Sequence, residues 1–87
     1  MKIVSGFILR SVAGNNIVVP VGENAKKFNG VINLNESGVF MWKKLEQGIE
    51  LDDLVKALTE EYDVDEQTAR KDAQAFTQAL ITAQIAK

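Results

Sequence analysis

The stretch GVINLNESGVFMW, residues 30–42, joins a short strand directly to a helix. Val31 to Leu34 favour an extended strand, and Asn35 can cap the helix that follows, because its side chain can accept a hydrogen bond from an N–H of the first turn. No later segment is expected to form a strand, so one edge of this strand has no partner. An open strand edge beside a helix is a place where an extended peptide can add itself to a sheet. The stretch therefore predicts a binding domain.

The residues before this stretch predict a β-hairpin. Phe7 to Ala13 and Ile17 to Val21 are rich in strand-forming residues, and the Gly-Asn-Asn run between them, residues 14–16, tolerates positive φ angles. Pro20 lacks a backbone N–H and is expected near a strand end. The polar segment from Gly22 to Gly30 is expected to be a loop or a wide turn. The third strand then pairs antiparallel with the second.

Two helices are predicted between Asn35 and Tyr62. The first is expected to end at Gly48 and to bury one face that consists of Val39, Trp42 and Leu45, flanked by Phe40 and Met41. The second has apolar residues at the helical spacing i, i+3, i+4 and i+7, namely Leu51, Leu54, Val55 and Leu58. It is expected to end around Glu61 and Tyr62, and Glu50 is a poor cap for its start.

A third helix is predicted from Asp65, a good N-cap, to about Gln84. Its apolar face is expected to consist of Ala69, Ala73 (or Asp72), Phe76, Leu80 and Ala83. No charged residue lies between Asp72 and Lys87, although a fully solvated helix usually carries more charge. Two interpretations stay open: an exposed Ala/Gln/Thr helix, or a helix whose polar face covers a partner. Together these segments predict one α+β domain over residues 1–87, with a three-stranded antiparallel sheet followed by three helices.

The composition excludes several classes of function. The 87 residues contain no cysteine and no histidine, so disulfides, thiol chemistry and the commonest transition-metal ligands and acid–base groups are missing. We expect a protein that is not an enzyme and that uses no metal and no cofactor. The net charge is −2, which disfavours nucleic acid. No apolar run approaches the ~20 residues of a membrane helix, and no signal peptide is recognised, so a cytoplasmic protein with no membrane partner is expected.

Charged and aromatic clusters elsewhere have plainer explanations. The pairs Asp52-Asp53 and Glu60-Glu61 are adjacent on helices, so their carboxylates point about 100° apart and indicate solvated faces. Acidic residues balance the lysine pairs at 26–27 and 43–44, which gives little support to a nucleic-acid surface. Trp42, Phe40 and Phe76 at helical spacing are more typical of a core than of a ligand pocket.

A spaced set of residues from Leu34 to Tyr62 follows the pattern L-N-x-[ST]-G-x-x-x-W-x-x-L-x-x-G and continues into a second helix that ends in Tyr. This pattern resembles the PqqD family, as does the later pair Asp72 and Phe76, so the resemblance covers about residues 7–80. It implies a small winged-helix-turn-helix-like domain of three strands and three helices, also called a RiPP recognition element. Such domains bind the leader segment of a ribosomally made precursor peptide and present it to a modifying enzyme, often a radical SAM protein. The product of the namesake pathway is the cofactor PQQ.

The resemblance also implies where a peptide binds. In the family, the leader adds as a fourth strand and lies against the third helix. By position, this implies backbone pairing at Val31, Ile32, Asn33 and Leu34. From the estimated phase of the third helix, we expect four groove-facing residues, Arg70, Ala73, Gln74 and Thr77. Two positions depart from the family pattern: Glu50 replaces a Thr-like cap, and Gln84 stands where many members have Gly, which opens a different arrangement of the last residues.

Two other classes of function remain as alternatives. A winged-helix DNA-binding regulator has a similar topology but needs a basic recognition helix, whereas the third helix here is uncharged after Asp72. A structural dimerisation module, in which the uncharged helix or the strand edge is self-complementary, gives a homodimer. The cognate peptide, the partner enzyme and the product of its pathway are not determined by the sequence.

Overall fold

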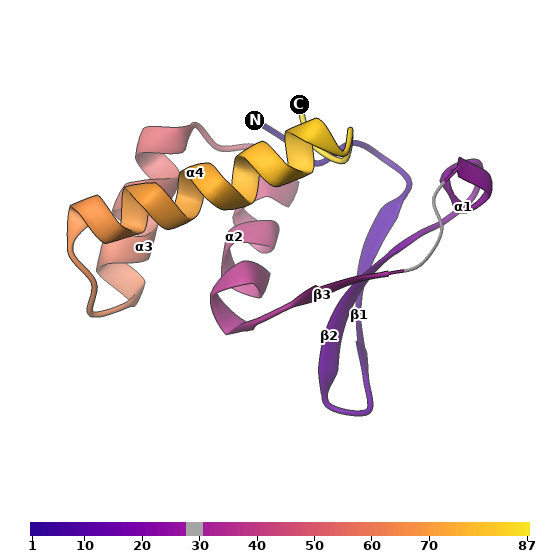
Figure 1. The fold of residues 1–87 in the computed structure, drawn as a ribbon, viewed down its shortest axis with the longest axis horizontal. Coiled ribbons are helices and arrows are strands. Elements are labelled where there is room, and N and C mark those ends of the chain that lie inside the picture. Colours follow the sequence, from indigo (N-terminus) through magenta and orange to yellow (C-terminus); the bar gives the residue numbers. More distant parts are fainter. Residues whose placement is uncertain (28–30) are drawn as a thin grey trace.

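The computed structural model describes residues 1–27 and 31–87, and this part of the chain contains three strands and four helices. In chain order they are β1 (Phe7–Val12), β2 (Asn15–Pro20), α1 (Asn24–Lys27), β3 (Ile32–Leu34), α2 (Glu36–Gln47), α3 (Leu51–Glu61) and α4 (Glu66–Thr82). Figure 1 shows the sheet at one side of the molecule, α2, α3 and α4 at the other, and β3 leading from the sheet into α2. The predicted α+β layout is confirmed, and α1 is an addition to it.

The sheet is antiparallel throughout and has the order β1-β2-β3. Ala13 and Gly14 form a two-residue turn between β1 and β2, with φ angles of 51° and 82°. Turns with positive φ at both positions match the right-handed twist of a hairpin. The prediction of a turn at residues 14–16 is therefore wrong by one or two positions, because Asn15 pairs with Val12 across the hairpin. Pro20 lies at the end of β2, as predicted.

Helix α1 lies in the segment that was predicted to be a loop. It is a single turn, in which the N–H of Ala25 donates to the oxygen of Gly22 and the N–H of Lys26 to that of Glu23. The Asn24 side chain donates to the oxygen of Ser5 at 3.0 Å, so α1 is fastened to the segment before β1. Residues 28–30, at the end of the predicted loop, lie outside the described residues.

Helix α2 has the two predicted ends. The Asn35 side chain accepts a hydrogen bond from the N–H of Gly38 at 2.8 Å, and Gly48 follows the helix with a φ of 86°. A Cβ at position 38 would lie 3.1 Å from the Asn35 side-chain oxygen, so glycine permits the close approach of the cap. The buried face consists of Gly38, Met41, Trp42 and Leu45. The predicted face was wrong at Val39, which is only half-buried, and Met41 takes the core position.

Helices α3 and α4 begin as predicted. No side chain caps α3 at Glu50, whereas the Asp65 carboxylate accepts from the N–H of Thr68 at 2.9 Å at the start of α4. Helix α4 ends at Thr82, two residues earlier than predicted, because Gln84 adopts a φ of 64°. The N–H of Ile85 then donates to the oxygen of Leu80 at 2.8 Å and the N–H of Gln84 to that of Ile81 at 3.0 Å, which is the Schellman pattern of a helix end.

The core consists of two clusters. One joins the sheet to the helices through Phe7, Val18, Trp42, Leu45, Leu80, Ile85 and Ala86. The other lies among the helices and consists of Met41, Leu54, Val55, Leu58, Ala69 and Ala73. Ile49 and Phe76 pack against both clusters. The first cluster thus holds β3 beside α2 and α4.

Candidate binding groove

The hydrogen-bond pattern of the sheet determines which backbone groups of β3 point outward. In an antiparallel pair, hydrogen-bonded and non-hydrogen-bonded residue pairs alternate. The N–H of Val21 donates to the oxygen of Gly6 at 2.8 Å, and Val12 and Asn15 close the hairpin. Hydrogen-bonded pairs with β1 therefore recur at every second residue of β2 between Asn15 and Val21, so Ile17 and Val19 direct their backbone groups toward β1. Asn16 and Val18 therefore direct theirs toward β3.

The same alternation continues across β3. Leu34 is opposite Asn16 and Ile32 is opposite Val18, so the backbone groups of Leu34 and Ile32 are used in pairing with β2. Asn33, opposite Ile17, directs its N–H and C=O toward the open edge. Within the described residues, no strand pairs with this edge. The open edge of β3 therefore offers one donor and one acceptor at Asn33.

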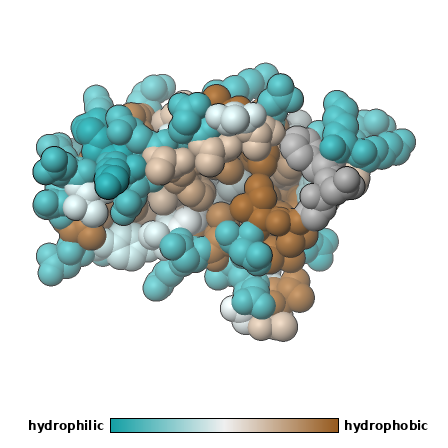
Figure 2. Space-filling view, viewed as in Figure 1, coloured by the Kyte–Doolittle hydropathy of each residue, from teal (hydrophilic) through white to brown (hydrophobic). Residues whose placement is uncertain are grey.

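The side chains of β3 alternate between two faces. Ile32 and Leu34 pack against the core cluster that contains Val18, whereas Asn33 is exposed on the opposite face. A strand added beside β3 has the same alternation, so every second side chain turns toward α4. Figure 2 shows that hydrophobic side chains on this side of the molecule gather over the sheet.

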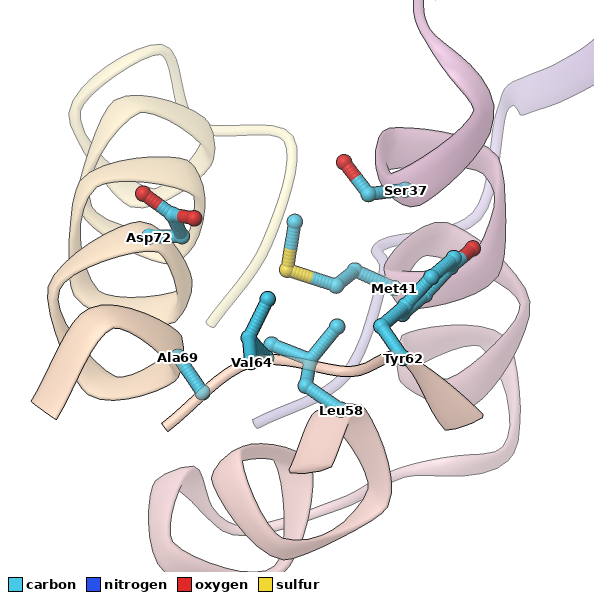
Figure 3. Close-up of a pocket in the computed structure, with 7 residues that line it drawn as sticks. All are labelled: Ser37, Met41, Leu58, Tyr62, Val64, Ala69 and Asp72. Carbon is cyan, nitrogen blue, oxygen red and sulfur yellow. The ribbon is translucent and has the colours of Figure 1, made fainter. Parts of the chain in front are cut away.

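An open groove lies beyond the end of β3, between α2 and α4. Its residues are Asn35, Ser37 and Met41 on one side and Asp72, Ala75 and Phe76 on the other. The groove adjoins a more enclosed pocket of about 170 Å³, which is lined by Ser37, Met41, Leu58, Tyr62, Val64, Ala69 and Asp72. In Figure 3 the Asp72 carboxylate on α4 and the Ser37 side chain on α2 flank the opening, with the Met41 side chain between them. Ser37, Met41 and Asp72 are shared by the groove and the pocket.

Aromatic contacts support one wall of the pocket. The rings of Tyr62 and Phe40 meet edge to face with centroids 5.6 Å apart, and the Lys44 ammonium lies 5.4 Å from the centre of the Phe40 ring. Desolvation raises the pKa of the Tyr62 hydroxyl, and the negative charges of Glu36 and Glu61 raise this pKa further. The Tyr62 side chain is therefore neutral at physiological pH and offers an aromatic surface.

The four predicted residues at the strand edge lie where they were expected, with different roles. Val31 precedes β3 and is 51% exposed. Ile32 and Leu34 hold β3 to β2 and to the core. Asn33 is the residue of β3 that turns its backbone to the open edge. Backbone pairing of these four residues with a peptide stays a prediction, and the alternation within a strand favours Asn33, because alternate residues serve each edge.

The four predicted residues on α4 do not line the groove. Ala73 and Thr77 are 0% and 5% exposed, and the Thr77 hydroxyl donates to the oxygen of Ala73 at 2.8 Å. The Arg70 guanidinium donates to the Asp52 carboxylate on α3 at 2.9 Å. Gln74 lines a different open hollow, together with Met1, Leu51 and Ile81. The groove-facing prediction for this helix was wrong, because α4 is turned so that Ala69, Ala73, Thr77 and Leu80 pack inward.

The groove-facing residues of α4 are Asp72, Ala75 and Phe76. Asp72 and Phe76 are four positions apart and so share one helix face. They are also the pair on which the family resemblance rested for this helix, so the sequence contained the feature that locates the groove. None of the described helices has the length and hydropathy of a membrane span.

Comparisons with known proteins agree with this fold. The fold is similar to TbiB1 in complex with the TbiA(beta) leader peptide, with a TM-score of 0.77 and 24% identity over 98% of this chain and 93% of that chain. It is also similar to lasso peptide synthetase B1 complexed with the leader peptide, with a TM-score of 0.73 and 18% identity over 94% and 91% of the two chains. No curated protein matches the sequence. The family model described as Coenzyme PQQ synthesis protein D (PqqD) matches residues 17–85, and the chain therefore belongs to the PqqD family.

Proposed function

We propose that this protein is a non-catalytic binder of the leader segment of a ribosomally synthesised precursor peptide. The leader adds as a strand to the open edge of β3 and lies in the groove against α4. The bound peptide is then presented to a modifying enzyme such as a radical SAM protein, in a PQQ-type pathway or another RiPP pathway. The observation that carries the proposal is the edge of β3, where the backbone groups of Asn33 have no strand partner among the described residues and lie beside an open groove.

The chemistry of strand addition fits these features. Main-chain hydrogen bonds give affinity for an extended peptide of almost any sequence, and alternate side chains that enter the groove give selectivity. Because β3 has three residues, the paired segment is short, and a dissociation constant of about micromolar is expected. None of this needs a catalytic group.

The surface of α4 favours a peptide over duplex DNA. Between Asp72 and Lys87 the chain has no charged residue, and binding to DNA depends on several lysine or arginine contacts with phosphates. A homodimer through the open edge of β3 remains an alternative occupant of the same surface. Sedimentation at several concentrations distinguishes it, because a monomer at every concentration removes this alternative.

The variant Asn33→Pro tests the proposal directly. Its missing N–H is the one that points to the open edge, so no hydrogen bond to β2 is lost. Ser11→Pro is the matched control: Ser11 is exposed on β1, and the same alternation directs its N–H to the opposite edge of the sheet. We expect Asn33→Pro to weaken binding of leader peptides encoded beside the gene by at least about ten-fold, and Ser11→Pro to leave it unchanged.

An amide NMR titration locates the bound peptide and verifies the fold of both variants. We expect shifts on Val31 to Leu34 and on the face of α4 that contains Asp72 and Phe76. Equal affinity of the folded Asn33→Pro variant, or shifts confined to other surfaces, contradicts strand addition at β3.

A further inference from the structure

The pocket beyond the groove is not needed for strand pairing, and its shape indicates what else it binds. We propose that it receives one large apolar side chain of the bound peptide, and that Asp72 pairs with a lysine or arginine next to that residue. This inference rests on the proposed function and specifies the peptide: a leader with an apolar anchor flanked by a basic residue. The anchor belongs to the part of the peptide that passes beyond Leu34, because the pocket lies past the end of β3.

The size and lining of the pocket fit an apolar side chain. Its volume is about 170 Å³, and a cavity of roughly 150 Å³ lined by apolar side chains holds a benzene ring. Its walls are mainly the side chains of Met41, Leu58, Tyr62, Val64 and Ala69. Val64 is 39% exposed at this site although it is a large apolar residue, so an inserted side chain would also cover Val64. Methionine adapts to side chains of different shape, and Met41 lies at the centre of the site (Figure 3).

The charge at the opening selects the neighbouring residue. The Asp72 carboxylate is exposed and has no ion-pair partner among residues 1–27 and 31–87. The nearby cation Arg70 is already paired with Asp52 at 2.9 Å. Glu36 and Glu61 add negative charge near Tyr62, and the Lys44 ammonium over the Phe40 ring offsets part of it. An acidic peptide residue at the opening is therefore repelled, and a basic one is attracted.

Continuity with the groove makes the pocket accessible to a peptide already paired with β3. Ser37, Met41 and Asp72 line both hollows, so the chain need not leave the surface between them. A side chain from the groove face of the added strand thus meets the pocket as the peptide passes α2.

A selection from displayed random-sequence peptides on the immobilised protein tests this inference without knowledge of the natural leader. We expect the enriched peptides to share a large apolar residue with a lysine or arginine close to it. One enriched peptide, fluorescently labelled, is then titrated with the variants. Asp72→Lys should weaken its binding about ten-fold, and replacement of the basic residue in the peptide by glutamate should restore binding to this variant. Glu46→Lys is the control, because Glu46 is exposed near the other end of α2 and should change affinity little.

Filling the pocket gives an independent readout. Ala69→Met adds a flexible side chain to the wall and should weaken binding by about ten-fold or more, since the anchor loses its burial. The same substitution at the exposed Ala25 on α1, which Figure 1 shows far from α3, is the control. If Ala69→Met does not fold, the enriched peptide with its apolar residue changed to alanine gives the same comparison on the unchanged protein.

The outcomes separate this inference from the proposed function. Enriched peptides that lose affinity for Asn33→Pro but bind Asp72→Lys and Ala69→Met unchanged overturn the pocket assignment and leave strand addition standing. No enriched peptide, or peptides indifferent to Asn33→Pro, overturns both. Loss of binding with Asp72→Lys and its rescue by the glutamate peptide support both.

Discussion

Gln84 is one of two non-glycine residues with a positive φ in the described part of the chain. It occupies the position after the α4 cap where glycine is the usual residue, because a Cβ costs about 1 kcal/mol in this conformation. The helix end nevertheless forms, since Ile85 and Leu80 are both in the core. The departure from the family pattern at this position therefore leaves the helix end intact and places a strained residue there.

Replacement of this residue by glycine relieves the strain. We expect Gln84→Gly to raise the free energy of unfolding by about 1 kcal/mol, measured by urea denaturation. Gln74→Gly on the same helix is the control, because Gln74 is exposed within α4, and it should lower the free energy of unfolding by about 1 kcal/mol. An unchanged or lower stability for Gln84→Gly would show that the conformation carries no strain.

The helices differ in how far local chemistry determines them. Both ends of α2 and the start of α4 were predicted because Asn35, Gly48 and Asp65 act within one turn of their own position. The apolar face of α4 was predicted at Ala69, Ala73 and Leu80, which are buried, but not at Thr77. The polar type of Thr77 hides its inward position from the sequence pattern, because its hydroxyl is satisfied by the oxygen of Ala73 within the helix. Helix α1 is one turn long and has no periodicity to detect.

The cap of α4 predicts a dependence of stability on pH. Hydrogen bonding to Thr68 lowers the pKa of the Asp65 carboxyl below its ordinary value. A group with a lower pKa in the folded state contributes stability above its unfolded pKa, about 3.9, and loses it as the pH falls through the folded pKa. Asp65→Asn keeps a cap without the charge. The unchanged protein should therefore have a higher urea midpoint than Asp65→Asn at neutral pH, and the two midpoints should coincide in acid.

The control for this comparison is Asp63→Asn. Asp63 is exposed and lies outside the helices, and no hydrogen bond of its side chain is seen within the described residues. If Asp63→Asn changes the urea midpoint with the same size and pH dependence as Asp65→Asn, the role of the cap is contradicted.

The molecule as a whole is held together by residues that touch both parts of its core. Ile49 is half-buried between the cluster that contains Trp42 and the one that contains Leu54. The sequence indicated that both sets of residues are apolar, but not that they divide into two clusters, since this depends on contacts between distant segments. The only tryptophan, Trp42, reports on the cluster beside the sheet, whereas far-ultraviolet circular dichroism reports mainly on the helices.

Truncation of the shared residue tests this coupling. We expect Ile49→Ala to lower the free energy of unfolding by about 2 kcal/mol, because the side chain is only partly buried. Tryptophan fluorescence and circular dichroism should still give coincident urea transitions, as for the unchanged protein. Two separated transitions in the unchanged protein would mean that the clusters unfold independently.

The two ends of the described chain are fastened to each other. The N–H of Lys2 donates to the oxygen of Lys87 at 2.8 Å, the N–H of Lys87 donates to that of Lys2 at 2.9 Å, and Ile3 is bridged to Ala86. Figure 1 shows both ends beside the last turn of α4, across that helix from β3. A linker attached at either end thus departs from the same place, across α4 from β3. An enzyme fused to the N-terminus and one fused to the C-terminus of this domain would therefore lie at a similar distance from the bound peptide.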